Sequence, residues 1–116
     1  MRSPVGGLTG RPEFLRAAKG RKSVAPGLVL QSCRQRDSDA PVRVGFTASR
    51  RVGGAVERNR ARRRLRAAVR AVMPQHAEPG HDYVLIARKE TLRRDFSALT
   101  GDLEKALKRL DLWRSR

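Results

Sequence analysis

The segment ERNRARRRLRAAVR, residues 57–70, contains seven arginines and one acidic residue. A guanidinium group binds a phosphate through two parallel hydrogen bonds, so this density of arginine indicates contact with a polyanion. At about 100° per residue, a helix over this segment presents five polar residues on one face: Asn59, Arg62, Arg63, Arg66 and Arg70. Solvated helix faces usually mix both signs of charge, and here only Glu57 offsets the arginines. The segment therefore favours a nucleic-acid-binding face over a merely solvated one.

A glycine-containing loop, SRRVGGAV (49–56), precedes this basic helix. Unpaired backbone N–H groups at a helix N-terminus favour phosphate, and Arg50 and Arg51 add two cations there. The helical angle of Arg58 points toward the apolar side, but in the first turn its side chain can project past the core. No GxxxxGK[ST] pattern occurs, so the loop is not a Walker-type nucleotide site.

Residues suited to acid–base or metal chemistry are few. His76 and His81 are the only histidines, and no cluster of Cys, Asp or Glu accompanies them. Cys33 is the single cysteine, so it forms no internal disulfide. The sequence predicts neither a catalytic residue nor a metal site within the protein itself.

The composition limits the class of protein. A chain of 116 residues suits one small domain, and 27 basic against 11 acidic residues give a formal net charge of +16. Such a charge favours a polyanionic partner. No apolar run approaches the ~18 residues of a membrane span, and the N-terminus lacks the apolar segment of a signal peptide. We expect a cytoplasmic protein that does not contact a membrane.

The apolar pattern predicts the elements that position the basic helix. In chain order they are a helix over 11–19, strands over 27–33 and 41–47, a helix over 56–72, a strand over 82–88 and a helix over 96–110. The first two strands are expected to pair as a hairpin, because the residues between them are polar and turn-prone. Pro74 is expected to end the basic helix, and Asp95 to be the N-cap of the last helix. The apolar residues of the basic helix fall on one face, namely Ala61, Leu65, Ala68, Val69 and Val72. We expect a flexible tail over 1–10 and a single domain over 11–113.

The stretch VGFTASRRVGGAVERNRARRRLRAAVR (44–70) resembles the signature of the bacterial ribonuclease P protein subunit. The shared features are a Val-Gly strand, a basic loop with serine, a glycine turn followed by Ala-Val, and Arg-Asn-Arg at the start of a basic helix. The likeness extends from RPEF through DYVLIAR to the last helix. It implies an α+β fold, a single-domain αβββαβα sandwich similar to the ribosomal S5 domain 2, with a left-handed βαβ crossover.

The resemblance also implies a function. In that family the catalyst is a magnesium-dependent RNA, and the protein helps it to bind precursor tRNA and remove the 5′ leader. The protein would thus be a subunit of an endoribonuclease and would be inactive by itself. Mg²⁺ would be bound mainly by ribonuclease P RNA. We expect one protein monomer per RNA in the ribonucleoprotein.

Site residues follow from the same likeness, position by position. Those matching the family's RNA-subunit-facing positions are Arg50, Arg51, Arg58, Asn59, Arg60, Arg62, Arg63 and Arg66. Those matching its leader-binding cleft, between the first helix and the sheet, are Phe14, Val29, Gln31 and Arg43. Position 54 is Gly where the family usually has Asn, and Ala18 and Gln31 replace larger or aromatic residues. For Phe14, packing in the core and stacking on a base are equally compatible with the sequence.

Two other functions compete with this one. A ribosomal or ribosome-associated RNA-binding protein would share the charge and a similar fold, and only the ordered motif argues against it. A protein nuclease is disfavoured, because the sequence has neither a carboxylate cluster nor a histidine pair suited to catalysis.

Overall fold

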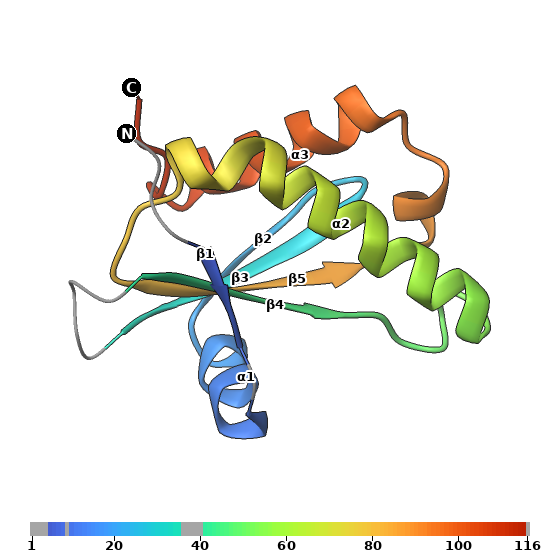
Figure 1. The fold of residues 1–116 in the computed structure, drawn as a ribbon, viewed down its shortest axis with the longest axis horizontal. Coiled ribbons are helices and arrows are strands. Elements are labelled where there is room, and N and C mark those ends of the chain that lie inside the picture. The colour runs from blue at the N-terminus through green and yellow to red at the C-terminus, as the bar shows by residue number, and fades with distance from the viewer. Residues whose placement is uncertain (1–4, 9, 36–40, 116) are drawn as a thin grey trace.

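A computed structural model describes residues 5–8, 10–35 and 41–115 of the chain. Its elements are β1 (Val5–Gly7), α1 (Arg11–Ala18), β2 (Arg21–Val24), β3 (Leu28–Arg34), β4 (Val42–Thr47), α2 (Ala55–His76), β5 (His81–Ala87), the short 3₁₀ helix η1 (Lys89–Leu92) and α3 (Phe96–Arg109). The strands form one mixed sheet in the order β1-β4-β5-β3-β2. Helices α2 and α3 cover one face of this sheet, and α1 lies on the other (Figure 1). The α+β class predicted from the sequence is confirmed.

The main core lies between the sheet and the pair α2 and α3. Along β3 the side chains alternate: Leu28 and Leu30 are fully buried, whereas Val29 and Gln31, on the opposite face, are partly exposed. The buried side chains of α2 and α3 are Ala61, Leu65, Ala68, Val69, Val72, Met73, Leu99, Asp102, Leu103, Ala106 and Leu107. Because α1 is only eight residues long, the second face of the sheet is covered only in part.

The predicted hairpin between the strands at 27–33 and 41–47 is wrong. Strand β5 lies between β3 and β4, antiparallel to β3 and parallel to β4. Its residues Asp82–Leu85 are all buried, since they have neighbours on both faces of the sheet, and such a strand takes a central position. The hairpin partner of β3 is instead β2, a short strand that the sequence analysis did not predict.

The predicted flexible tail over 1–10 is corrected in the part that the structure describes. Val5–Gly7 forms β1, which pairs in parallel with β4 and places Val5 opposite Val42. The Leu8 N–H continues the pairing by donating to the Val44 carbonyl (3.1 Å). This strand therefore forms one edge of the sheet, while residues 1–4 and 9 lie outside the described part.

Helix α2 does not end at Pro74 as predicted, but continues to His76. Pro74 lacks the N–H that would bond to the carbonyl of residue 70, so the helix loses one hydrogen bond here without ending. The next turn still closes, because the Ala77 N–H donates to the Met73 carbonyl (3.0 Å). Asp95 occupies the predicted N-cap position of α3, although its side chain makes no capping hydrogen bond.

Candidate nucleic-acid interface

Helix α2 separates its apolar and basic residues onto different sides. The predicted buried face, Ala61, Leu65, Ala68, Val69 and Val72, is at most 9% exposed and packs against the sheet. Arg60, Arg63, Arg66 and Arg70 are exposed, as is Asn59. The long helix crosses the whole molecule (Figure 1). Its basic side is therefore a continuous surface, which is the geometry that the arginine spacing predicted.

The positive charge of this surface is not neutralised by the described part of the protein. No arginine of α2 forms a salt bridge with any residue that the structure describes. The one acid of the helix, Glu57, accepts a hydrogen bond from the Gly54 N–H (3.3 Å) and so closes the N-terminus of the helix. An uncompensated row of guanidinium groups is a binding surface for a polyanion.

Four arginines of α2 differ in how they are held. Arg62 donates to the amide oxygen of Asn59 (2.5 Å), and Arg66 lies over the ring of Phe46, 5.3 Å from its centroid. Arg64 donates to two backbone carbonyls beyond β5, including that of Thr91 (2.7 Å), so it fastens the helix to that segment. Arg58 is partly exposed, yet its Nε is buried and has no hydrogen-bond partner among the described residues. Arg64 therefore has a structural contact, whereas Arg62 and Arg66 contact neighbouring side chains and form no salt bridge among the described residues.

The loop before α2 holds Arg50 and Arg51 in exposed positions beside the helix N-terminus. Val52, 8% exposed, anchors this loop in the core. Gly53 has φ +149°, and a Cβ there would lie 2.8 Å from the Cβ of Glu57. Glycine is thus required at 53 by backbone conformation and by close approach. At Gly54 a Cβ would meet nothing closer than 3.5 Å, so the Asn usual in the resembled family would fit.

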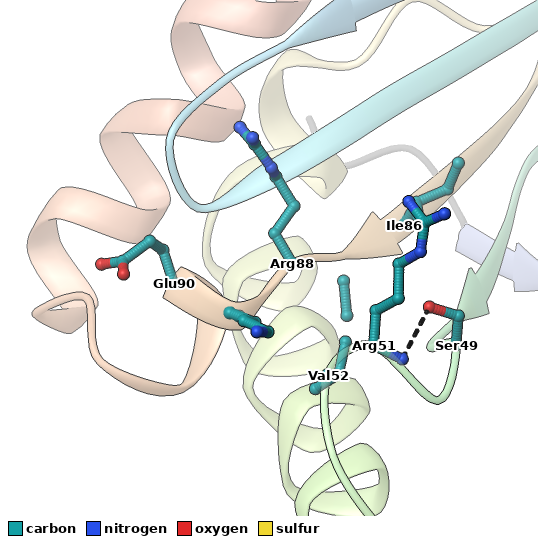
Figure 2. Close-up of a pocket in the computed structure, with 8 residues that line it drawn as sticks. Ser49, Arg51, Val52, Ile86, Arg88 and Glu90 are labelled. Atoms are coloured by element: carbon teal, nitrogen blue, oxygen red, sulfur yellow. Dashed lines mark hydrogen bonds between the residues drawn. The ribbon is translucent and has the colours of Figure 1, made fainter.

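A cavity of about 380 Å³ opens between this loop and the end of β5 (Figure 2). Its lining includes Arg51 and Ile86 together with Arg88, Lys89 and Glu90. Arg88 and Lys89 were not among the predicted site residues. They reach this place because β4 and β5 are parallel, so that the residues after each strand meet at the same edge of the sheet, and this pairing is visible only in the structure.

The predicted leader cleft corresponds to the face of the sheet that α1 only partly covers. Phe14 of α1 is partly buried, and its ring lies against Gly45, where a Cβ would come within 2.4 Å of the Phe14 Cζ. Gln31 and Gly45 both lie opposite Val84 in the register, and Val29 lies opposite Ile86. The structure thus places Phe14, Gln31 and Val29 on one face, with Val29 toward the end that is farther from Phe14.

Arg43 lies on the same face but is already engaged. Its Nε and Nη2 each donate to the carboxylate of Asp82 at 2.8 Å, and its Nη1 lies 3.3 Å from Glu13. The hydrogen bonds to Asp82 raise the pKa of Arg43 above its usual value. Two carboxylates offset this guanidinium, so it differs from the unpaired arginines of α2.

Among the residues that the structure describes, no helix is long and apolar enough to cross a membrane. No group of three or more His, Cys, Asp or Glu lies together within them as a candidate metal site.

The fold and the arginine-bearing helix define a small basic RNA-binding domain of the α+β class. A sequence model of the family described as Ribonuclease P matches residues 6–111. The chain belongs to the ribonuclease P protein family, and this membership distinguishes it from the ribosomal proteins considered as an alternative.

Individual relatives agree with this assignment. The chain is 54% identical over 101 residues to the ribonuclease P protein component of Caulobacter vibrioides strain NA1000, covering 86% of this chain and 67% of that protein. Identity to the ribonuclease P protein component of Paramagnetospirillum magneticum is 55% over 107 residues, covering 89% and 80%. The solved RNase P protein of Thermotoga maritima matches with a TM-score of 0.70 at 27% identity, over 85% and 91% of the two chains. That of Staphylococcus aureus matches in fold, with a TM-score of 0.76 at 24% identity over 93% and 97%.

Proposed function

We propose that this protein binds ribonuclease P RNA through the exposed side of α2 and the loop at 49–51. The observation that carries the proposal is the row of α2 arginines without a salt bridge to any described acid. The proposed contact residues are Arg50, Arg51, Arg58, Asn59, Arg60, Arg62, Arg63 and Arg66. Guanidinium groups held on a rigid helix lose little entropy on meeting phosphates, which supports a helix as the docking element.

The proposed site for the 5′ leader of precursor tRNA is the open face of the sheet beside α1. Phe14 offers an aromatic edge, and Val29 and Ile86 form a partly exposed apolar strip on adjacent strands. Bases of a single strand stack on such surfaces. Ile86 also lines the cavity with Arg51 and Lys89, so cations lie at one end of the strip, where they can bind leader phosphates. Arg88 lines the same cavity but donates to the Ala25 carbonyl (2.6 Å), so it has a structural contact.

In this proposal the RNA subunit performs the cleavage, with Mg²⁺ bound mainly by that RNA. The protein supplies affinity for the leader and reduces repulsion among phosphates, which lowers the magnesium concentration that the RNA requires. We also propose that one protein monomer binds each RNA and that the complex acts in the cytoplasm. These points rest on membership of the family.

The test is cleavage of precursor tRNA by a bacterial ribonuclease P RNA at low Mg²⁺. Adding the protein should raise the rate of correct 5′ cleavage, and the protein alone, freed of RNA, should give none. A variant with Arg60→Ala and Arg63→Ala lacks two of the proposed contacts and should stimulate cleavage less. Both positions are exposed and lie off the buried face of α2, so the variant should still fold. If the protein does not stimulate cleavage, or if it cleaves without RNA, the proposal fails.

A further inference from the structure

Asp82, near the start of the central strand β5, has a fully buried carboxylate that polar groups surround. Its Oδ1 accepts from the Arg43 Nε and the Gln35 Nε2, both at 2.8 Å. Its Oδ2 accepts from the Arg43 Nη2 at 2.8 Å and the Arg16 Nη2 at 3.2 Å. Four donors on two oxygens satisfy a buried carboxylate, and the donors come from α1, β4 and the end of β3.

Helix α1 takes part in this network through residues of both signs. Arg16 reaches Asp82, and Glu13, one turn earlier, lies 3.3 Å from Arg43. The apolar contact of α1 with the sheet involves few side chains: Ala17 is buried and Phe14 is partly buried, but Leu15 is 49% exposed. A short helix with so little buried apolar area needs other contacts to fix its orientation.

The two α1 residues of this network flank the aromatic residue of the proposed leader site in the sequence. Phe14 lies between Glu13 and Arg16 in the sequence, so the two charged contacts fix the turn that carries its ring. The ring packs against Gly45, which has no side chain. A shift of α1 by a fraction of its width would move the ring off Gly45 and change its distance from Val29.

We propose that Asp82 is a positioning residue for leader recognition: through Arg43 and Arg16 it holds α1, and with it Phe14, at the spacing from the sheet that the leader requires. This inference rests on the proposed function, because it assumes that the leader binds beside α1. Asp82 itself contacts no RNA, since its side chain is fully buried. Its removal would free Arg43 and Arg16, whose side chains are 35% and 43% exposed and can be solvated, so the sheet itself remains intact.

The first experiment measures amide hydrogen exchange in the free protein carrying Asp82→Asn. Asparagine has nearly the same shape but presents N–H donors to the two arginines, so the network opens. The amides of α1 should exchange at least about tenfold faster than in the wild type, while those of α2 and α3 keep their rates. Unchanged exchange in α1 would overturn the inference, whatever the RNA measurements give.

The matched control is Asp102→Asn. Asp102 is also buried, and it accepts two hydrogen bonds from Arg94 (3.1 and 2.9 Å) and one from the Gly27 N–H (3.0 Å). It belongs to α3, on the opposite face of the sheet. Asp102→Asn loses an ionic contact comparable to the one that Asp82→Asn loses, so it controls for a general loss of stability. Amide exchange in α1 should not change in this variant.

The second experiment compares precursor and mature tRNA binding to the assembled ribonucleoprotein. Asp82→Asn should lower the preference for precursor by about fivefold or more, the factor that corresponds to one lost stacked base, while Asp102→Asn preserves it. If Asp82→Asn instead raised the preference for precursor tRNA, Asp82 would act only by neutralising Arg43 and Arg16. That result would overturn the inference. A wild type without any preference would instead refute the proposed leader site, leaving the exchange data to judge whether Asp82 holds α1.

A second variant protects the test if Asp82→Asn does not fold. Arg16→Gln removes one contact of α1 from a half-exposed side chain and leaves the Arg43–Asp82 pair in place. It should produce the same two changes to a smaller extent. No change in α1 exchange and none in precursor preference would overturn the inference.

Discussion

Phe14→Ala separates the two roles that the sequence left open for this residue. The ring is partly buried and contacts Gly45 on the open face of the sheet, away from the main core. Truncation of a fully buried phenylalanine costs ~3–5 kcal/mol of unfolding free energy, so we expect about half of that here, roughly 2 kcal/mol. If one leader base stacks on the exposed part of the ring, affinity for precursor tRNA falls by a further ~1–3 kcal/mol, or about 5-fold to 150-fold.

The assay is equilibrium binding of precursor and mature tRNA to the ribonucleoprotein assembled with each variant, paired with a thermal melt of the protein. Mature tRNA has no leader, so its affinity should not change. Phe96→Ala is the matched control, because Phe96 is 44% exposed at the start of α3, on the other face of the sheet. It removes an aromatic side chain without altering the proposed leader site.

The reasoning is refuted if Phe14→Ala lowers stability while precursor and mature tRNA are affected equally. Phe14 would then be a packing residue, and the leader would have to bind at Gln31, Val29 and the strip around Ile86. A loss of precursor affinity that Phe96→Ala reproduces would refute it equally, because the effect would not depend on the face of the sheet.

Three further predictions concern α2 and the loop before it. The variant with Arg60→Ala and Arg63→Ala should bind ribonuclease P RNA more weakly for every precursor and melt as the wild type does; a lowered melting temperature would contradict the placement of both residues off the core. Wild-type binding to that RNA should weaken with salt at a log–log slope near −4, from about five phosphate contacts, and a slope near zero would exclude phosphate neutralisation as its basis. Gly53→Ala should cost ~1–3 kcal/mol in denaturant unfolding, because its φ is +149° and its Cβ would lie 2.8 Å from that of Glu57. Gly54→Asn should instead be neutral or stabilising by a few tenths of a kcal/mol as an N-cap, and equal costs at the two positions would contradict the loop geometry.

The basic helix was the part of the site most completely predicted from the sequence. The spacing of Leu65, Ala68, Val69 and Val72 predicted which side is buried, and the structure confirms it. This works because an amphipathic helix carries its pattern within one continuous segment, where each residue's direction follows from its position. The end of the helix was less predictable, since Pro74 stops a helix only where no neighbouring turn compensates for its missing donor.

The order of the strands could not be obtained in the same way. A polar segment between two strand patterns indicates a hairpin, but β5, nearly 40 residues later in the chain, lies between β3 and β4. The strand that must bury both of its faces takes the centre of the sheet. The helices that cover those faces lie elsewhere in the sequence, so a short segment does not show which strand this is. The same non-local pairing places Arg88 and Lys89 beside Arg51, which explains why the analysis of single motifs missed them.

The sequence by itself determined that this protein carries a basic helix with one apolar side, because charge and helical periodicity are local properties. Only the tertiary structure decided which arginines have a carboxylate partner among the described residues. Arg43 has the same charge as Arg63, but the register of β4 with β5 places it against Asp82, and α1 adds Glu13. The charge environment of Arg43 therefore depends on groups that folding brings to it from two other elements, β5 and α1.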